Sequence, residues 1–307
     1  MAESFWVETL GAQTRYYDAG GHRTRCIEAG SGEPLVLLHG ISGHAETWIR
    51  NVTTLARTHH VYALDMLGHG FTDKPVIDYT VPALAEHVLA FLDTIGAQRA
   101  TLVGQSLGGW VAGWLAVHRP DRVAALVSVT GAGLQLHAEG ADLTRRVGTQ
   151  VREATQRAFA NPTRETVRTR LEWLVHDTGL ITDELVETRY RIFTQPDFLA
   201  VTGRLLDGLT ATAGEQDVLD EQALRKISCP TLVLWTRHNP TMQWDVGKAA
   251  SELIPGAAWH LMEDAGHWPQ FERPEEFHRV LAAFLAGTAA AGGAGDTLRS
   301  TATQESR

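Results

Sequence analysis

The chain alternates short, continuous apolar runs with helix-length amphipathic segments. The apolar runs are residues 35–38, 61–64, 101–103, 124–129 and 232–235. None has the polar alternation of a half-exposed strand, so each is typical of a strand covered on both faces. Segments between them, such as 81–95 and 107–118, place apolar residues at helical spacing. Strands and helices in this order form a parallel sheet through right-handed crossovers, and the sequence therefore predicts an α/β fold.

Two departures from the alternation indicate the domain organisation. Residues 13–17 and 23–28 flank an Asp-Ala-Gly-Gly turn, which predicts an antiparallel hairpin at one edge of the sheet. From 131 to 228 the pattern changes to amphipathic helical stretches, which are 141–159, 163–174, 183–193 and 196–209. A helical block inserted there would lie over the carboxyl edge of the sheet, where open α/β folds bind ligands. We expect a core of residues 1–130 and 229–286, a lid of 131–228, and a disordered tail of small and polar residues, 287–307.

Composition excludes several classes of partner. Among the 307 residues, 27 Lys and Arg against 36 Asp and Glu give a net charge of −9, and no basic run interrupts the acidic balance. Nucleic acid and anionic membrane surfaces are therefore disfavoured, and a small-molecule partner is expected. Cys26 and Cys229 match neither a disulfide framework nor a metal-ligand spacing. We therefore expect no metal site. The sequence shows no signal peptide and no long apolar span, so we expect a cytoplasmic protein.

Residues Gly104–Gly108 read Gly-Gln-Ser-Leu-Gly and stand between an apolar run and a helical segment. This is the G-x-S-x-G motif in the strand–turn–helix context that it requires. The two glycines let the strand and the helix approach closely, while a strained turn holds the Ser106 hydroxyl above the sheet. We therefore expect Ser106 to be a catalytic nucleophile.

Two further loops supply partners for this serine. Residues 37–43 (LLHGISG) end an earlier strand, where the backbone N–H of Ile41 is expected to form an oxyanion hole with that of Leu107. Residues 260–269 (HLMEDAGHWP) follow the last strand and place His267 in the position of a general base. His39 is expected to be a structural histidine that bonds nearby backbone.

With these motifs, residues 20–285 resemble the α/β-hydrolases, and within them the meta-cleavage product hydrolases, which cut a carbon–carbon bond in 2-hydroxy-6-oxo-dienoates formed by aromatic ring fission. The segments that carry the resemblance are His39–Gly43, Asp65–Gly70, Gln105–Trp110 and Gly266–Gln270. The resemblance implies an α/β-hydrolase fold, with a mostly parallel eight-stranded sheet, helices on both faces and a helical lid after strand 6. It also implies a serine-dependent hydrolase that uses no cofactor and forms a homodimer.

Residues 183–190 look like the lid segment whose arginine grips the substrate carboxylate in this family, which implies that role for Arg189. An arginine can clamp a carboxylate with two parallel hydrogen bonds and so hold a dienoate in position for attack. The alternative is a solvated arginine paired with Glu187 or Asp183 on the outer face of the lid.

The resemblance also places Trp268, Ser42 and Gly43 among the substrate-binding residues. Trp268 stands beside the general base and would supply an aromatic wall or an indole donor, although simple core packing is the alternative. The lid also carries large aromatic side chains, which suggest an apolar pocket. They are Phe159, Trp173, Phe193 and Phe198.

The sequence departs from the family pattern at the catalytic acid. An Asp or Glu is expected just after the seventh strand, and the matching position is Asn239. Asparagine can orient His267 but brings no negative charge, and in serine proteases the same change lowers kcat by about 10⁴. Three explanations compete. Asp245 or Asp264 replaces the acid, Asn239 is sufficient because the acidic enol of the substrate demands less of the base, or the pocket performs other chemistry.

Two other functions share these residues. A carboxylesterase or lactonase acting on natural-product esters would use Ser106 and His267 without needing Arg189. A cofactor-independent oxygenase or lyase would use His267 to deprotonate its substrate and Ser106 only to bind it, which suits the absence of an acid at 239. The two alternatives differ from carbon–carbon hydrolysis in whether Ser106 or Arg189 is required for turnover.

Overall fold

The computed structural model describes residues 4–136, 149–150, 152–159, 161–211 and 217–302. Its centre is an eight-stranded sheet in the order β1-β2-β4-β3-β5-β6-β9-β10. The strands are β1 (Gln13–Ala19), β2 (His22–Ala29), β3 (Pro34–Leu38), β4 (His60–Leu64), β5 (Ala100–Gln105), β6 (Val123–Val129), β9 (Thr231–Thr236) and β10 (Ala258–Met262). β2 runs antiparallel to both β1 and β4, and the other pairs are parallel. The predicted mostly parallel sheet with an antiparallel edge is confirmed.

The strands form where the sequence analysis expects them because their side chains are buried on both faces. All four residues from Leu35 to Leu38 in β3 are fully buried, and β9 is buried along its whole length. By contrast, β1 is an edge strand and is mostly exposed. The β1–β2 hairpin turns at Gly20 and Gly21, whose positive φ angles of 65° and 84° suit a tight turn.

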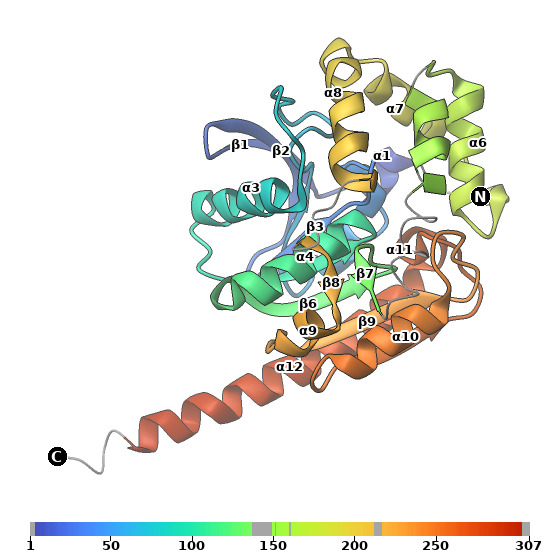
Figure 1. The fold of residues 1–307 in the computed structure, drawn as a ribbon. Coiled ribbons are helices and arrows are strands. Elements are labelled where there is room, and N and C mark those ends of the chain that lie inside the picture. The colour runs from blue at the N-terminus through green and yellow to red at the C-terminus, as the bar shows by residue number, and fades with distance from the viewer. Residues whose placement is uncertain (1–3, 137–148, 151, 160, 212–216, 303–307) are drawn as a thin grey trace.

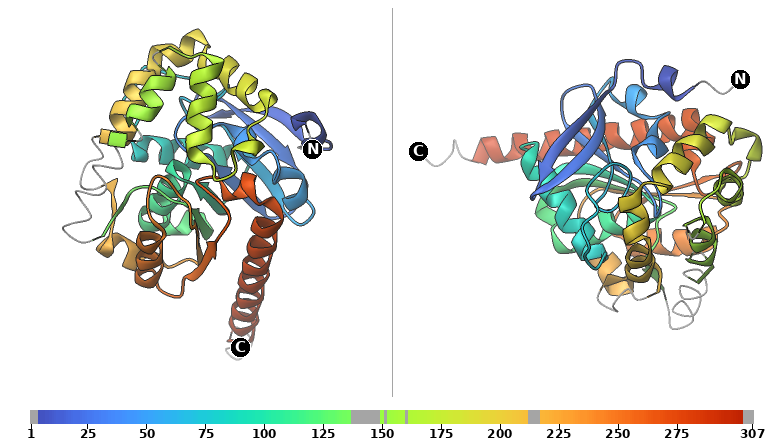
Figure 2. Two further views of the ribbon diagram at one scale, coloured as in Figure 1. Left: turned by 90° about the vertical axis from the view of Figure 1, so that its right-hand side faces the viewer. Right: turned by 90° about the horizontal axis from the view of Figure 1, so that it is seen from above.

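Helices cover both faces of the sheet (Figure 2). On one face lie α3 (Val81–Thr94), α4 (Leu107–His118), α9 (Glu221–Lys226) and α10 (Trp244–Leu253). On the other lie α2 (Val52–Leu55), the 3-10 turn η1 (Ala45–Trp48) and α12 (Pro274–Ala302). Trp48 in η1 packs against Phe277 in α12 with ring centroids 6.1 Å apart, which closes this second layer of the core. The shorter elements are α1 (Phe5–Glu8), η2 (Pro120–Arg122), η3 (Thr178–Leu180) and α11 (Pro269–Glu272).

The insertion after β6 forms a helical lid over one edge of the core (Figure 1). It consists of a helical stretch at 152–159, α6 (Arg164–Leu174), α7 (Asp183–Phe193), α8 (Pro196–Leu206) and the π-helical turn η4 (Asp207–Ala211). Two short strands, β7 (Leu134–Gln135) and β8 (Leu219–Asp220), pair in parallel and join the ends of the insertion to the core. Part of the helical stretch expected at 141–159 lies outside the described residues.

Two boundaries differ from the expected ones. The expected lid, 131–228, includes α9, but α9 packs against α4 and α10 and so belongs to the core. The expected disordered tail, 287–307, is helical as far as Ala302, because α12 continues through it and projects from the body of the molecule (Figure 1). The alanines of this stretch favour extension of an existing helix. No described helix, α12 included, is long and apolar enough to cross a membrane.

Candidate active site

Ser106 occupies a sharp turn between β5 and α4. Its φ of 53° and ψ of −114° lie outside the regions that a serine normally adopts. The close approach of the elements requires glycine, since a Cβ on Gly108 would lie 2.2 Å from the carbonyl oxygen of Leu38. Although Ser106 stands at the N-cap position of α4, its side chain accepts no backbone N–H there. The hydroxyl is therefore not consumed by helix capping.

Ser106 opens into a cavity of about 120 Å³ between the core and the lid. A water molecule needs only roughly 10–15 Å³ on this measure, so the cavity can hold a small organic molecule. The polar and charged side chains that line it include Ser106, His267, Thr241, Gln105, Arg170 and Arg189, and the apolar ones include Ile41, Leu107, Trp110, Leu174, Leu209, Val218 and Met242. Among its described lining residues there is no Asp or Glu.

The two expected oxyanion residues line the same cavity as the serine. Ile41 follows β3, and Leu107 is the first residue of α4. Within the described part of the chain, neither backbone N–H donates a hydrogen bond. Two unengaged N–H groups beside a serine hydroxyl can receive negative charge that develops on a bound carbonyl oxygen.

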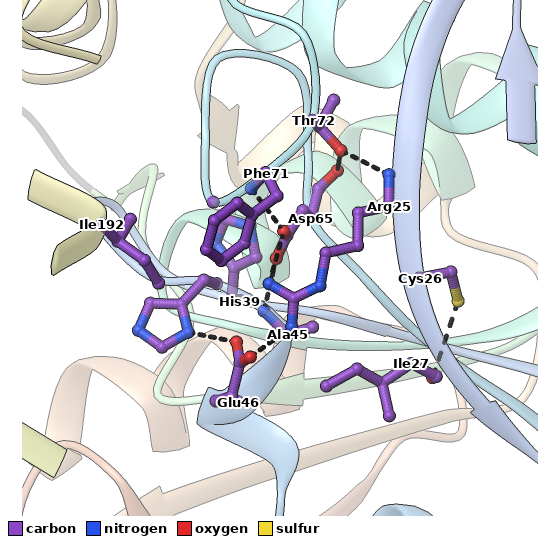
Figure 3. Close-up of polar contacts among 12 residues, drawn as sticks. Arg25, Cys26, Ile27, His39, Ala45, Glu46, Asp65, Phe71, Thr72 and Ile192 are labelled. Carbon is purple, nitrogen blue, oxygen red and sulfur yellow. Dashed lines mark hydrogen bonds and ion pairs between the residues drawn. The ribbon is translucent and has the colours of Figure 1, made fainter. Parts of the chain in front are cut away.

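A buried polar network holds the loop that carries Ile41. The Asp65 carboxylate accepts hydrogen bonds from the N–H of Ala45 at 2.6 Å and the N–H of Phe71 at 2.8 Å. Arg25 lies between Asp65, which it contacts at 3.2 Å, and Glu46, to which it donates a charge-assisted hydrogen bond (Figure 3). Because these groups are buried and mutually satisfied, they tie the loop after β3 to β2 and β4. Sequence reasoning quoted the Asp65 motif without finding this role.

His39 in the same loop is structural, as expected. Its Nε2 accepts a hydrogen bond from the N–H of Met66 at 3.1 Å, so Nδ1 carries the proton and donates to the carbonyl of Gly40 at 2.8 Å. Complete burial lowers the pKa of His39 to about 3. His39 is therefore neutral, and both of its ring nitrogens are hydrogen-bonded to backbone groups.

His267 pairs with Asn239. The Nδ1 of His267 lies 2.9 Å from the Oδ1 of Asn239, and that oxygen also accepts hydrogen bonds from Thr241, at 2.9 Å from Oγ1 and 3.2 Å from the backbone N–H. These donors present the amide oxygen, rather than the amide nitrogen, to the imidazole. The Nδ1 of His267 is then the protonated nitrogen, and Nε2 is left as the basic one. Asp245 and Asp264, the alternative partners, are both exposed.

The surroundings of His267 keep it neutral. Burial is the main cause that lowers the pKa of His267 to about 3, and the charge of Arg170 contributes to this shift. Hydrogen bonds to the backbone of His267 hold the histidine loop in place. Its carbonyl oxygen accepts from Gln105 Nε2 and Thr130 Oγ1, each at 3.0 Å. Its N–H donates to the carbonyl of Leu174 in the lid at 2.6 Å. Within the described part of the chain, no hydrogen bond joins His267 Nε2 to Ser106 Oγ, although both side chains line the cavity.

Arg189 is buried in the cavity wall, with 2% of its surface exposed. Its Nη1 donates to the carbonyl oxygen of Ser42 at 3.0 Å, and its guanidinium lies 4.5 Å from the ring centre of Trp268. Its Nε has no hydrogen-bond partner among the described residues. Burial lowers the pKa of Arg189 to about 9, and the charge of Arg170 contributes. Arg189 therefore does not belong to the solvated outer face of the lid.

The acidic residues proposed as alternative partners of Arg189 are engaged elsewhere. Glu187 pairs with Arg164 and Arg191, each at 2.7 Å, and Asp183 pairs with Arg168 at 2.5 Å. Of the three other residues expected to contact the substrate, two line the cavity and one does not. Gly43 and Trp268 line the cavity, whereas Ser42 is absent from its lining and instead orients Arg189 through its carbonyl.

Two buried charged residues of the site were missed by sequence reasoning. Glu272 accepts hydrogen bonds from the N–H groups of Gly266, Trp268 and His176, and so ties the histidine loop to the lid. Arg170 lines the cavity from α6. Its burial could have been read from the sequence, because it shares one helical face with apolar residues. These are Val167, Leu171 and Leu174.

The lid aromatics do not line the cavity as expected. Phe159 meets Phe193 and Phe198 edge to face, with ring centroids 4.9 and 5.0 Å apart, and Phe193 stacks on Phe198 at 5.3 Å. These rings form the lid's own small core, because a helical insertion must bury an apolar face to stay folded. The apolar wall of the cavity comes from smaller aliphatic residues together with Trp110 and Trp268.

A family model described as alpha/beta hydrolase fold matches residues 33–274. The chain belongs to the α/β-hydrolase family. This α/β-hydrolase is 30% identical to the 2-hydroxymuconate semialdehyde hydrolase of Pseudomonas putida, with 87% of this chain and 92% of that protein covered. It is 32% identical to the 2-hydroxy-6-oxononadienedioate/2-hydroxy-6-oxononatrienedioate hydrolase of Paraburkholderia phymatum, with 91% and 98% covered. Among solved structures, the meta-cleavage product hydrolase of Pseudomonas fluorescens has a TM-score of 0.74 at 26% identity and covers 91% of this chain and 99% of its own.

Proposed function

We propose that this α/β-hydrolase cleaves the carbon–carbon bond next to the 6-oxo group of a 2-hydroxy-6-oxo-dienoate. The observation that carries the proposal is Arg189, a buried cation against Trp268 that has no carboxylate partner among the described residues and lines the same cavity as Ser106. A hydrolase of uncharged esters has no use for a buried, unpaired guanidinium, whereas a dienoate carboxylate completes it. The relatives that act on such dienoates support the same substrate class.

The reaction begins with proton transfer. Neutral His267, oriented by Asn239, takes the enol proton of the substrate and delivers it to carbon 5, which converts the dienol into a ketone. The acidic enol lowers the demand on the base, and this is the role that we assign to a histidine without a carboxylate partner. Arg189 holds the substrate carboxylate during this step and so fixes the 6-oxo carbon near Ser106.

Bond cleavage follows at carbon 6. Ser106 Oγ, or a water activated through His267, attacks the 6-oxo carbon, and the N–H groups of Ile41 and Leu107 receive the oxyanion. The bond between carbons 5 and 6 then breaks, and its electron pair is delocalised into the dienolate. Protonation of the dienolate releases a 2-hydroxydienoate. When Ser106 is the nucleophile, water hydrolyses the remaining acyl group to give the second carboxylic acid.

Product analysis tests this proposal. The protein is incubated with 2-hydroxy-6-oxo-hexa-2,4-dienoates that carry phenyl, alkyl or carboxyalkyl groups on carbon 6, and the products are separated and identified by mass. We expect equimolar 2-hydroxypenta-2,4-dienoate and the acid derived from the carbon 6 substituent. If no member of this panel is cleaved while simple esters or lactones are hydrolysed, the proposal fails in favour of an esterase.

We also propose that the enzyme works in the cytoplasm, as expected from its sequence, and that it is a homodimer, as the family resemblance implies. Light scattering behind size-exclusion chromatography gives the mass in solution. A mass near twice that of the 33.6 kDa chain supports the dimer, and a mass equal to one chain refutes it.

A further inference from the structure

Arg170 presents a second guanidinium to the cavity. It projects from α6, is 7% exposed, and donates from Nη2 to Thr155 Oγ1 at 3.3 Å. Among the described residues, its buried Nε and Nη1 atoms have no hydrogen-bond partner. Its guanidinium lies 4.7 Å from the ring centre of Trp173. The reaction proposed above assigns no task to this residue.

The two arginines are held at separate places in the cavity wall. Arg189 is positioned by the Ser42 carbonyl and Trp268, whereas Arg170 is positioned by Thr155 and Trp173. Arg189 also donates from Nη2 to Thr47 Oγ1 at 3.5 Å. Each guanidinium thus has its own acceptors and its own aromatic ring, and each keeps at least one N–H group without a partner among the described residues. The described lining contributes no carboxylate to either.

An unpaired buried cation is costly, and the cost is removed when an anion binds beside it. Burial lowers the pKa of Arg170 to about 9, so the guanidinium still carries its charge at neutral pH. A substrate with one carboxylate, bound at Arg189, leaves the Arg170 cation without an anion. This second cation remains uncompensated unless the substrate brings a second anionic group.

We infer that Arg170 forms a second anion-binding subsite, and that the substrate is a dicarboxylate whose dienoate end binds Arg189 while its distal carboxylate binds Arg170. This inference rests on the proposed function and narrows its substrate class. The two carboxylates hold the molecule at both ends, with the 6-oxo carbon between them near Ser106.

The distal carboxylate also acts on the base. Among the described residues, the polar side chains that act on the His267 ring are Asn239, Thr241 and Arg170, and of these Arg170 is the charged one. A carboxylate bound to Arg170 offsets the positive charge that disfavours a protonated His267. Part of the electrostatic role of the missing catalytic aspartate is then taken over by the substrate.

A matched pair of substrates tests the inference. One is 2-hydroxy-6-oxonona-2,4-dienedioate, and the other is 2-hydroxy-6-oxonona-2,4-dienoate, which lacks only the distal carboxylate. We expect the wild type to favour the diacid by about 10- to 100-fold in kcat/KM, the range of a hydrogen bond to a charged group. The Arg170→Met variant should lose this preference, and its kcat/KM for the monoacid should not fall, because the substitution also removes the positive charge that disfavours protonated His267.

Two further variants serve as controls. Arg170→Lys keeps the cation and should retain part of the preference. Arg191→Met removes an exposed arginine of α7 that pairs with Glu187, and should leave the preference unchanged.

Arg170→Met should also unfold at a higher temperature than the wild type, because it removes an unpaired buried charge, whereas loss of a purely structural arginine would lower the melting temperature. The inference is overturned if folded Arg170→Met slows both substrates equally, as expected when both arginines grip one carboxylate.

Equilibrium binding keeps this test independent of catalysis. Calorimetry compares nonanedioate with its monomethyl ester, which has the same length but one charge, on the wild type and Arg170→Met. Tighter binding of the diacid that depends on Arg170 supports the subsite even if no dienoate is cleaved, in which case only the proposed reaction fails. Cleavage of dienoates with equal binding of the two acids overturns the subsite and leaves the proposed reaction standing.

Discussion

The Nδ1 of His267 lies 2.9 Å from the Oδ1 of Asn239, in the place where this fold normally pairs its histidine with a carboxylate. Thr241 donates two hydrogen bonds to the same amide oxygen, which keeps the amide from turning its nitrogen toward the ring. The base is thus oriented without being charged. This neutral pair suits a substrate whose enol is acidic better than one whose attack requires a strongly stabilised imidazolium.

Asn239→Asp should distinguish dienoate cleavage, which needs only a neutral base, from ester hydrolysis, which needs a stabilised imidazolium. The carboxylate can accept the same hydrogen bonds from Thr241 and adds a charge that stabilises protonated His267. We expect the variant to hydrolyse p-nitrophenyl acetate at least about tenfold faster than the wild type, because ester attack depends on the imidazolium. Dienoate cleavage should change by less than about threefold. The measurement is the steady-state rate of each reaction at one pH. An equal gain in ester hydrolysis and dienoate cleavage would contradict the proposal that only ester hydrolysis depends on a carboxylate at position 239.

The pH profile offers a second check on the same residue. His267 must be neutral to act as a base, and its pKa is lowered to about 3. Since activity through a base is lost only as the pH falls through its pKa, kcat/KM should stay level between pH 7 and pH 5. Asn239→Asp raises this pKa and should bring an acid limb into that window. A wild-type profile that already falls off near pH 6.5 would show that His267 is not held neutral.

Arg189→Met should weaken substrate binding more than chemistry. The guanidinium is proposed to hold the dienoate carboxylate in both the bound substrate and the transition state, so its loss falls mainly on KM. We expect KM for a dienoate to rise by about 10- to 100-fold, with kcat reduced less than tenfold. Hydrolysis of an uncharged ester should be unaffected. Arg191→Met, on the exposed face of the same helix, should leave both constants unchanged, and a KM that does not respond to loss of Arg189 would remove it from the binding site.

Buried neutral histidines predict a loss of stability in acid. Burial lowers the pKa values of His39, His69 and His87 to about 3, while in the unfolded chain a histidine titrates near 6.5. Below pH 6.5 the unfolded state therefore binds protons that the folded state does not. Each such histidine lowers the free energy of unfolding by about 1.4 kcal/mol per pH unit between pH 6.5 and 3.

His87 allows this to be measured away from the active site. Its Nδ1 accepts from the N–H of Leu67 at 3.3 Å, and its Nε2 lies 2.8 Å from Thr24 Oγ1. The urea midpoint should fall between pH 7.5 and pH 5, and His87→Gln should shrink that difference while lowering the midpoint at pH 7.5. Equal midpoints of the wild type at the two pH values would refute the linkage.

The sequence was informative where a single physical requirement decides the structure. Strands buried on both faces need continuous apolar runs, and the turn at Ser106 needs glycine at 104 and 108, so both could be predicted. The partner of His267 could not, because three residues were in reach along the chain and only the folded loop brings the donors of Thr241 onto Asn239. Arg170 was overlooked although its helical spacing marked it as buried. The lid aromatics were assigned to the pocket because sequence alone does not tell the core of an insertion from its ligand-facing wall.

The most direct measurement of the central claim is single-turnover absorbance decay of 2-hydroxy-6-oxo-6-phenylhexa-2,4-dienoate with enzyme in excess, on the wild type and Ser106→Ala. We expect the wild type to bleach the dienoate and release both acids, and Ser106→Ala to bind the compound but cleave it at least about 1,000-fold more slowly. Cleavage by Ser106→Ala at the wild-type rate would remove Ser106 from the chemistry. A wild type that leaves the compound and its alkyl and carboxyalkyl analogues intact would contradict carbon–carbon hydrolysis itself.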